Sequence, residues 1–225
     1  MKKNEYTIKY VDGFDIRNLL DSEFGIVENR KVHRPHPRWY VPEGEVWIDS
    51  YVKDETDFFM RLIELEDEYL QADTHFHAFR DKIKKELASN DPVDLDVITK
   101  KTYRDGEYLV RELDGGIVRK DIDPYFVLGG HFRVYDYIPK GEIWLDSKMP
   151  LNVLKYTLIH ERVECMLMGR ELNYDISHDY ATSADREMRR QDGIYLALDD
   201  ADDHKKIPSS EKSFIELLLD KDILS

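Results

Sequence analysis

Two stretches of this 225-residue chain occur twice, in the same order. Residues 5–24 align without a gap on residues 107–126. Further along, YVPEGEVWIDS at 40–50 matches YIPKGEIWLDS at 137–147, with seven of eleven positions identical. Two matches in one order rarely arise by chance, so we expect a tandem duplication of a unit of about 90–100 residues, a usual size for a small domain. Recurring residues are then expected to be structural, and chemically capable residues that differ between the repeats become functional candidates.

The repeats set the predicted domain boundaries. The first repeat is expected at 1–90, as a degenerate copy, and the second at 107–191, with the candidate metal site. Residues 91–106 are interpreted as the linker between them. Residues 192–225 are expected to form a polar tail that ends in a short helix, SFIELLLDK.

Each repeat begins with alternating residues on both sides of an Asp-Gly pair, EYTIKYV-DG-FDIR and EYLVREL-DGG-IVRK. Glycine tolerates the positive φ of tight turns, so this pattern predicts a β-hairpin. The apolar period then changes from two to about 3.6, which predicts amphipathic helices. The expected fold class is α+β, a tandem duplication of a unit with a β-hairpin and small antiparallel sheet followed by two helices. Strands are expected at 44–49 and 141–146, and helices at 54–70, 72–88, 150–168 and 174–191.

The chain is strongly acidic, with a formal net charge of −14. Such a chain repels phosphate backbones and anionic lipid surfaces, so neither a nucleic acid nor a membrane is an expected direct partner. The first residues lack the apolar core of a signal peptide, and no stretch approaches the ~18 apolar residues of a membrane span. Cys165 is the only cysteine, which excludes an internal disulfide and fits a reducing compartment. We therefore expect a cytoplasmic protein.

The most informative short motif is His160-Glu161-Arg162-Val163-Glu164. Positions i and i+4 of a helix lie on one face, so His160 and Glu164 can reach the same metal ion. Glu161 lies one step around the helix, beside such an ion, where a general base would stand. The geometry is that of the HExxH metalloprotease helix with a carboxylate in place of the second histidine. The motif therefore predicts two metal ligands and a catalytic base on one helix.

A catalytic metal needs at least a third protein ligand, and the next predicted helix offers candidates. His178 and Asp185 are seven residues apart, so they share a face of that helix. A short turn around Gly169 would return this helix antiparallel to the first and bring the two faces together. We predict a site of His160, Glu164 and His178, with Asp185 as a fourth ligand or directly behind the ligands. Mixed nitrogen and oxygen ligation suits zinc first, and also manganese or iron.

The first repeat differs at the motif. An alignment with one deletion pairs three residues of the first repeat with the motif of the second. Glu64 is then opposite His160, Leu65 opposite Glu161 and Glu68 opposite Glu164. A leucine at the base position is the pattern expected of a degenerate copy. The alternative is a second, structural metal in the first repeat, held by Glu64, Glu68 and His75 or His77.

Residues 138–187 resemble small zincin-type metallohydrolases found in phages and bacteria. The resemblance rests on IPKGEIWLDS, followed by LIHERVECMLMG and then by YDISHDYATSAD. It implies that His160 is a metal ligand, that Glu161 is the general base, and that the strand GEIWLD lies beside an extended substrate. The chain departs from the family at Glu164, where zincins have histidine, and His178 lies further along than their usual third ligand.

The sequence supports two functional hypotheses. The first is a metal-dependent hydrolase, a peptidase or amidase acting on a small peptide or amide, with Glu161 as its catalytic residue. The second is a non-enzymatic acidic protein with a protein partner, either a DNA mimic or a component of a virion or other complex. In that second case the metal is structural or absent. An enzyme needs an open coordination position, whereas a structural site is closed.

Overall fold

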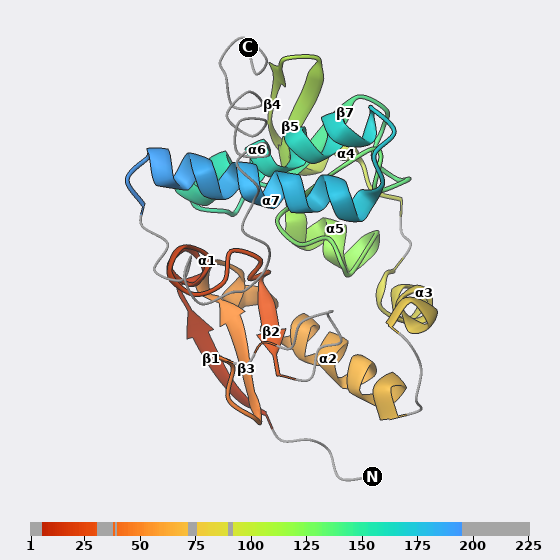
Figure 1. Ribbon diagram of the computed structural model, residues 1–225. Helices are drawn as coiled ribbons and strands as arrows, with labels where there is room; N and C mark the ends of the chain where they lie inside the picture. The colour runs from red at the N-terminus through yellow and green to blue at the C-terminus, as the bar shows by residue number, and fades with distance from the viewer. Residues whose placement is uncertain (1–5, 31–37, 39, 72–75, 90–91, 195–225) are drawn as a thin grey trace. The chain divides into compact units, whose positions relative to one another are not determined.

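The computed structural model describes residues 6–30, 38, 40–71, 76–89 and 92–194. Over these residues the protein is a mixed α/β structure with seven α-helices and two small sheets, of three and four strands (Figure 1). None of these helices has both the length and the apolar character that a bilayer crossing requires.

The first sheet is formed by β1 (Thr7–Val11), β2 (Val27–Asn29) and β3 (Glu45–Asp49), in the order β1-β3-β2. Strand β1 is parallel to β3, and β2 is antiparallel to it. The prediction of a small antiparallel sheet is therefore wrong in this respect, because the sheet is mixed. The parallel pair arises because the chain leaves β1 through a helix and not through a tight turn.

The second sheet repeats this arrangement and adds one strand. It is formed by β4 (Thr99–Asp105), β5 (Tyr108–Leu113), β6 (Gly129–His131) and β7 (Glu142–Asp146), in the order β4-β5-β7-β6. Strand β5 is parallel to β7, β6 is antiparallel to β7, and β4 is antiparallel to β5. Strands β5, β7 and β6 thus correspond to β1, β3 and β2.

The two sheets also agree in register. Val11 is opposite Asp49 in the first sheet, and Leu113 is opposite Asp146 in the second. A tryptophan at the centre of each middle strand donates its indole N–H to a glutamate two residues earlier, at 2.9 Å in both sheets. A glycine with positive φ precedes each middle strand, Gly44 with φ 80° and Gly141 with φ 84°. The recurring residues therefore serve the scaffold, as the sequence predicted.

The helices follow the predicted positions closely. Both repeats continue from the middle strand into two long helices, α2 and α3 in the first and α6 and α7 in the second. A 3₁₀ helix η1 precedes α2, and three short helices complete the described residues. Their bounds are α1 Gly13–Leu19, η1 Ser50–Glu55, α2 Thr56–Gln71, α3 Phe76–Leu87, α4 Leu95–Ile98, α5 Gly115–Asp121, α6 Leu151–Met168 and α7 Tyr174–Gln191.

The predicted hairpins at the Asp-Gly pairs are wrong. The segment after Asp114 is a helix, α5, whose first turn Asp114 caps by accepting hydrogen bonds from the N–H groups of Gly116 and Ile117. Aspartate before two glycines suits a helix start as well as a turn, because its short side chain can accept from the exposed N–H groups. Within the described residues, β4 and β5 do form a hairpin, with Gly106 at φ 57° in its turn.

Two other predicted segments have a different outcome. Residues 91–106, interpreted as a linker, contain α4 and the whole of β4, which belongs to the second sheet. The tail helix expected near the C-terminus lies outside the described residues, which end at 194.

The chain forms two compact units, and each unit contains a helix from the other sequence repeat. Unit 1 holds the first sheet, α2, α3 and α5, whereas unit 2 holds the second sheet, α6, α7 and most of α1. Unit 1 contains the described residues up to Gly13 with Phe24–Ile98 and Asp114–Val127, and unit 2 contains Phe14–Glu23, Thr99–Leu113 and the described residues from Leu128 onward.

Hydrogen bonds fix each exchanged helix in its unit. In unit 1, the buried Arg119 of α5 donates to both carboxylate oxygens of Glu55, at 2.7 and 2.8 Å. In unit 2, Arg189 of α7 donates to the Asn18 side chain of α1 at 2.6 Å. The two sequence repeats are therefore not self-contained folding units.

Candidate metal centre

Helices α6 and α7 of unit 2 bring the predicted ligands together. They lie side by side (Figure 1) and run antiparallel, since Tyr156 near the start of α6 bonds Asp192 after the end of α7. Small and branched side chains fill the space between them. The fully enclosed members of this core are Val163, Leu167, Ala181 and Ala184.

Three ligand atoms converge between the two helices. Nε2 of His160 lies 3.2 Å from Nδ1 of His178 and 3.5 Å from Oε2 of Glu164. Nδ1 of His178 lies 2.9 Å from the same glutamate oxygen. Tyr174, one turn before His178 on α7, stacks on the His178 ring with the two planes 21° apart, and so restricts its orientation. The sequence prediction that these three residues meet agrees with this geometry.

The separations are those of a coordination sphere. Ligand atoms about 2.0–2.2 Å from a tetrahedral zinc ion lie about 3.3–3.6 Å from one another. The three observed separations, 2.9, 3.2 and 3.5 Å, lie close to this range, so little movement is needed to admit an ion. The Glu164 side chain is 5% exposed, His160 16% and His178 34%, so the cluster opens towards solvent at His178.

A fourth residue, His131 on strand β6, completes the cluster and was missed by the sequence analysis. It is fully buried, and its Nε2 lies 3.1 Å from Oε1 of Glu164. The backbone N–H of Arg133 donates to Nδ1 of His131, so the ring proton resides on Nε2. His131 therefore donates to one oxygen of Glu164 and leaves the other to face the two histidines.

A sequence signal for His131 existed in the repeats. The strand registers place it opposite Asn29, so the repeats differ at a chemically capable position. The strand has only three residues and no periodicity that would mark one side chain as facing the helices.

Asp185 contacts His160 from the side of the ring that faces away from His178, and it belongs to neither group of candidate ligands. Its Oδ2 is 3.7 Å from Nδ1 of His160, the ring nitrogen that does not face His178. Its Oδ1 accepts a hydrogen bond from Arg189 at 3.3 Å. Carboxylates in this position fix the orientation of a metal-binding histidine, and of the two roles predicted for Asp185 the geometry suits this one.

The cluster shifts the ionisation of its own members. Burial alone would raise the pKa of Glu164, but hydrogen bonds from His131, His160 and His178 outweigh it and hold the pKa well below its usual range. Burial would lower the pKa of His160, yet hydrogen bonds with Asp185 and Glu164 raise it to about 10. Glu164 is thus held in its charged form, which is the form that can bind a cation. In the metal-free chain the positive charge of protonated His160 balances part of its negative charge.

Glu161 lies beside the ligands, as its place on the helix predicts. It forms a second group with His131 and Glu164 in which one ligand atom from each lies within 4.8 Å of the others. In the observed arrangement Nε2 of His131 is hydrogen-bonded to Oε1 of Glu164 at 3.1 Å. Burial raises the pKa of Glu161, and the charge of Glu164 raises it further. Glu161 is therefore a half-buried carboxylate whose ligand atom lies close to those of His131 and Glu164.

The first repeat does not reproduce the cluster among its described side chains. Continuing the strand register without a gap places Ile63 opposite His160, Glu64 opposite Glu161 and Asp67 opposite Glu164. Burial favours this alignment over the one with a deletion. Asp67 is buried like Glu164, whereas Glu68 is exposed.

The alternative prediction was a second metal in the first repeat, held by Glu64, Glu68 and His75 or His77. Glu64 and Glu68 belong to no group of three ligand side chains within the described part of the chain. Glu64 instead pairs with Arg61 at 3.4 Å. His75, and the side chain of His77, lie outside the described residues.

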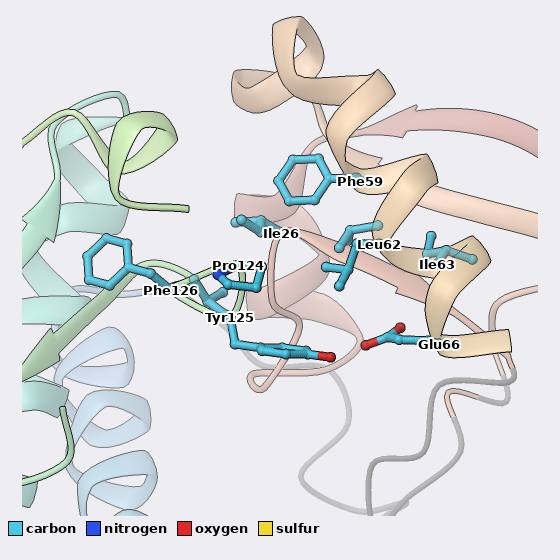
Figure 2. A pocket seen from close by; sticks show the side chains of 10 residues that line it. Ile26, Phe59, Leu62, Ile63, Glu66, Pro124, Tyr125 and Phe126 are labelled. Atoms are coloured by element: carbon cyan, nitrogen blue, oxygen red, sulfur yellow. The ribbon is translucent and has the colours of Figure 1, made fainter. Parts of the chain in front are cut away.

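Unit 1 contains a pocket of a different kind (Figure 2). Apolar side chains of α2, among them Phe59 and Leu62, line it together with the segment 124–127 that follows α5. Its polar side chains are Tyr125 and Glu66, and burial together with the charge of Glu66 raises the pKa of the Tyr125 hydroxyl. Neither of the two candidate metal groups among the described residues includes a residue of this lining.

Comparisons with known proteins assign neither the fold nor the site. No family model, no curated protein and no solved structure matches the chain.

Proposed function

We propose that the protein is a metal-dependent hydrolase of peptide or amide bonds, with one zinc ion held by His160, Glu164 and His178. The convergence of their three ligand atoms at 2.9–3.5 Å carries this proposal. The exposure of His178 supports a catalytic role, because a substrate and a water molecule need an open coordination position. The half-buried carboxylate of Glu161, close to Glu164, supports it further.

Each residue of the proposed site has a separate role in hydrolysis. A bound zinc ion would polarise the scissile carbonyl and lower the pKa of a water molecule. Glu161 accepts the proton as the water oxygen bonds to the carbonyl carbon, and then donates it to the departing amine nitrogen. Burial and the charge of Glu164 raise the pKa of Glu161, which makes its carboxylate a stronger proton acceptor. His131 and Asp185 hold Glu164 and His160 in place.

We further propose that the two halves arose by tandem duplication and that only the second kept the metal site. The shared strand order and register support the duplication. Ile63 and Asn29 stand where the second repeat has His160 and His131, so the first repeat retains the scaffold and lacks the histidines. One metal ion per chain is the expected stoichiometry.

Metal analysis of the purified chain tests the proposed site. Protein purified without added metal, then loaded with zinc and dialysed, should retain about one ion per chain. His160→Ala and His178→Ala should each lose it. Asp179→Ala is the matched control, because Asp179 is the exposed neighbour of His178 and belongs to neither metal group. A chain that refuses zinc, manganese and iron would refute the site.

A second experiment separates catalysis from a structural role. The zinc-loaded chain is incubated with a library of short peptides and amides, and cleavage is followed by mass spectrometry. Cleavage by the wild-type chain and none by His178→Ala supports the hydrolase. Stoichiometric zinc without cleavage of any member would instead favour the acidic binding or assembly protein with a structural metal.

A further inference from the structure

A line of buried polar side chains runs from the metal centre to α1, the helix that the first sequence repeat contributes to unit 2. Nδ1 of His160 faces Oδ2 of Asp185 at 3.7 Å, and Oδ1 of Asp185 accepts from Nε of Arg189 at 3.3 Å. Nη1 of Arg189 donates to Oδ1 of Asn18 at 2.6 Å. Asn18 and Arg189 are each 2% exposed and Asp185 is 6% exposed.

Each link in this line constrains the next. A buried guanidinium cannot lose its charge, so Arg189 must keep Asp185 as its counter-charge. Cζ of Arg189 lies over the Tyr156 ring, 4.3 Å from its centroid, and this contact restricts the movement of the guanidinium. Asn18 then fixes the remaining direction by accepting from Nη1. Asp185 is thereby held with one oxygen towards Arg189 and the other towards the imidazole of His160.

We infer that Asn18 is a positioning residue of the metal centre, and that the first repeat sets the metal affinity of the second through α1. This inference rests on the proposed function, because the metal ion is what His160 is positioned to bind. Loss of the Asn18 acceptor leaves a donor of Arg189 unpaired in a buried site. Arg189 must then turn towards another acceptor, which takes Asp185 away from the ring of His160.

The exchanged segment offers a matched control. Ser22 follows α1 in the same segment, and its Oγ accepts from Nε of Arg186 on α7 at 2.7 Å. Ser22→Ala therefore removes one hydrogen bond between the same two parts of the chain, as Asn18→Leu does. The difference is that Arg186 has no hydrogen bond to Asp185 among those recorded for the described residues. Asn18→Asp serves as the conservative variant, since it keeps an oxygen acceptor for Arg189.

The test measures zinc affinity of the full chain by competition with a chelator, together with unfolding by urea. Asn18→Leu should weaken zinc binding about 10- to 100-fold, the usual cost of removing a group that orients a ligand. Asn18→Asp should restore affinity to within about threefold of wild type, and Ser22→Ala should leave it unchanged. With cobalt as a probe in place of zinc, the visible absorption spectrum should change in Asn18→Leu and remain unchanged in Ser22→Ala.

Each outcome decides the inference. Equal zinc affinity in Asn18→Leu and wild type, or equal weakening in Asn18→Leu and Ser22→Ala, overturns it while the proposed site stands. A wild-type chain that binds no zinc overturns the proposed function and this inference together. If Asn18→Leu does not fold, Asn18→Ala gives the same comparison with a smaller change in volume, and its affinity is judged by the same criteria.

Discussion

His131 donates its Nε2 proton to Oε1 of Glu164 across 3.1 Å, from a strand of the sheet to the helix that packs on it. This bond selects which oxygen of Glu164 remains for the two histidines. It also gives the buried carboxylate a partner that stays when a metal ion displaces the proton of His160. The sheet therefore contributes to the centre although none of the three ligands belongs to a strand.

The first prediction concerns His131. We expect His131→Leu to weaken zinc binding about 10- to 100-fold, because Glu164 loses the donor that orients it. His131→Asn introduces the residue of the first repeat and can still donate from its amide, so its affinity should lie between those of wild type and His131→Leu. Chelator competition measures both. An unchanged affinity in His131→Leu would show that packing alone orients Glu164.

The second prediction concerns pH and the metal-free chain. In the folded state the pKa of His160 is raised to about 10, above its unfolded value of about 6.5. Protonated His160 therefore stabilises the folded state fully below about pH 6.5, and this contribution is lost as the pH rises towards 10. After removal of metal with a chelator, the free energy of unfolding of wild type should approach that of His160→Gln over this interval. A difference that is independent of pH would contradict the assignment.

The third prediction concerns unit 1. Arg119 is fully buried and makes two parallel hydrogen bonds to Glu55, so removal of Glu55 leaves a buried charge without its partner. We expect Glu55→Ala to destabilise the protein by about 3–5 kcal/mol, as measured by urea unfolding. Its zinc affinity should equal that of wild type, because neither residue belongs to unit 2. A loss of zinc affinity in the folded variant would reveal a dependence of the centre on unit 1.

The sequence predicted the long helices and the convergence of His160, Glu164 and His178 because both depend on local spacing. The 3.6-residue apolar period is clear in α7 and weak in α6, and the separation of four residues places His160 and Glu164 on one face of α6. His178 could be added because a short turn after α6 leaves few directions for the next helix.

Non-local features were not predictable in the same way. The Asp-Gly pairs were misread as hairpin turns because aspartate before glycine suits both a turn and a helix N-terminus, and tertiary packing decides between them. The exchange of α1 and α5 between units has no signal in the sequence, since a repeat by itself predicts two self-contained copies. Asn18 and His131 reach the centre only through these long-range arrangements.

The last prediction concerns Glu161. Its carboxylate offers an oxygen within 4.8 Å of ligand atoms of His131 and Glu164, but it is not one of the three proposed ligands. We expect Glu161→Gln to keep the fold and the stoichiometric zinc, because the amide fills the same volume and no ligand is removed. Turnover of a peptide or amide substrate should fall by about 10²–10⁴-fold, the usual contribution of a general base. Elemental analysis and initial rates on the same preparation measure the two effects separately.

Two further variants make this assignment specific. Glu164→Gln should weaken zinc retention, because it removes the charged ligand, whereas Asp179→Asn removes an exposed charge from the neighbouring helix and should change neither property. Loss of zinc in Glu161→Gln would make Glu161 a ligand, and the base would have to be sought elsewhere. Retention of both zinc and full turnover would eliminate Glu161 as the proton acceptor. Only retained zinc with impaired turnover is consistent with a carboxylate that lies beside the ion and moves a proton.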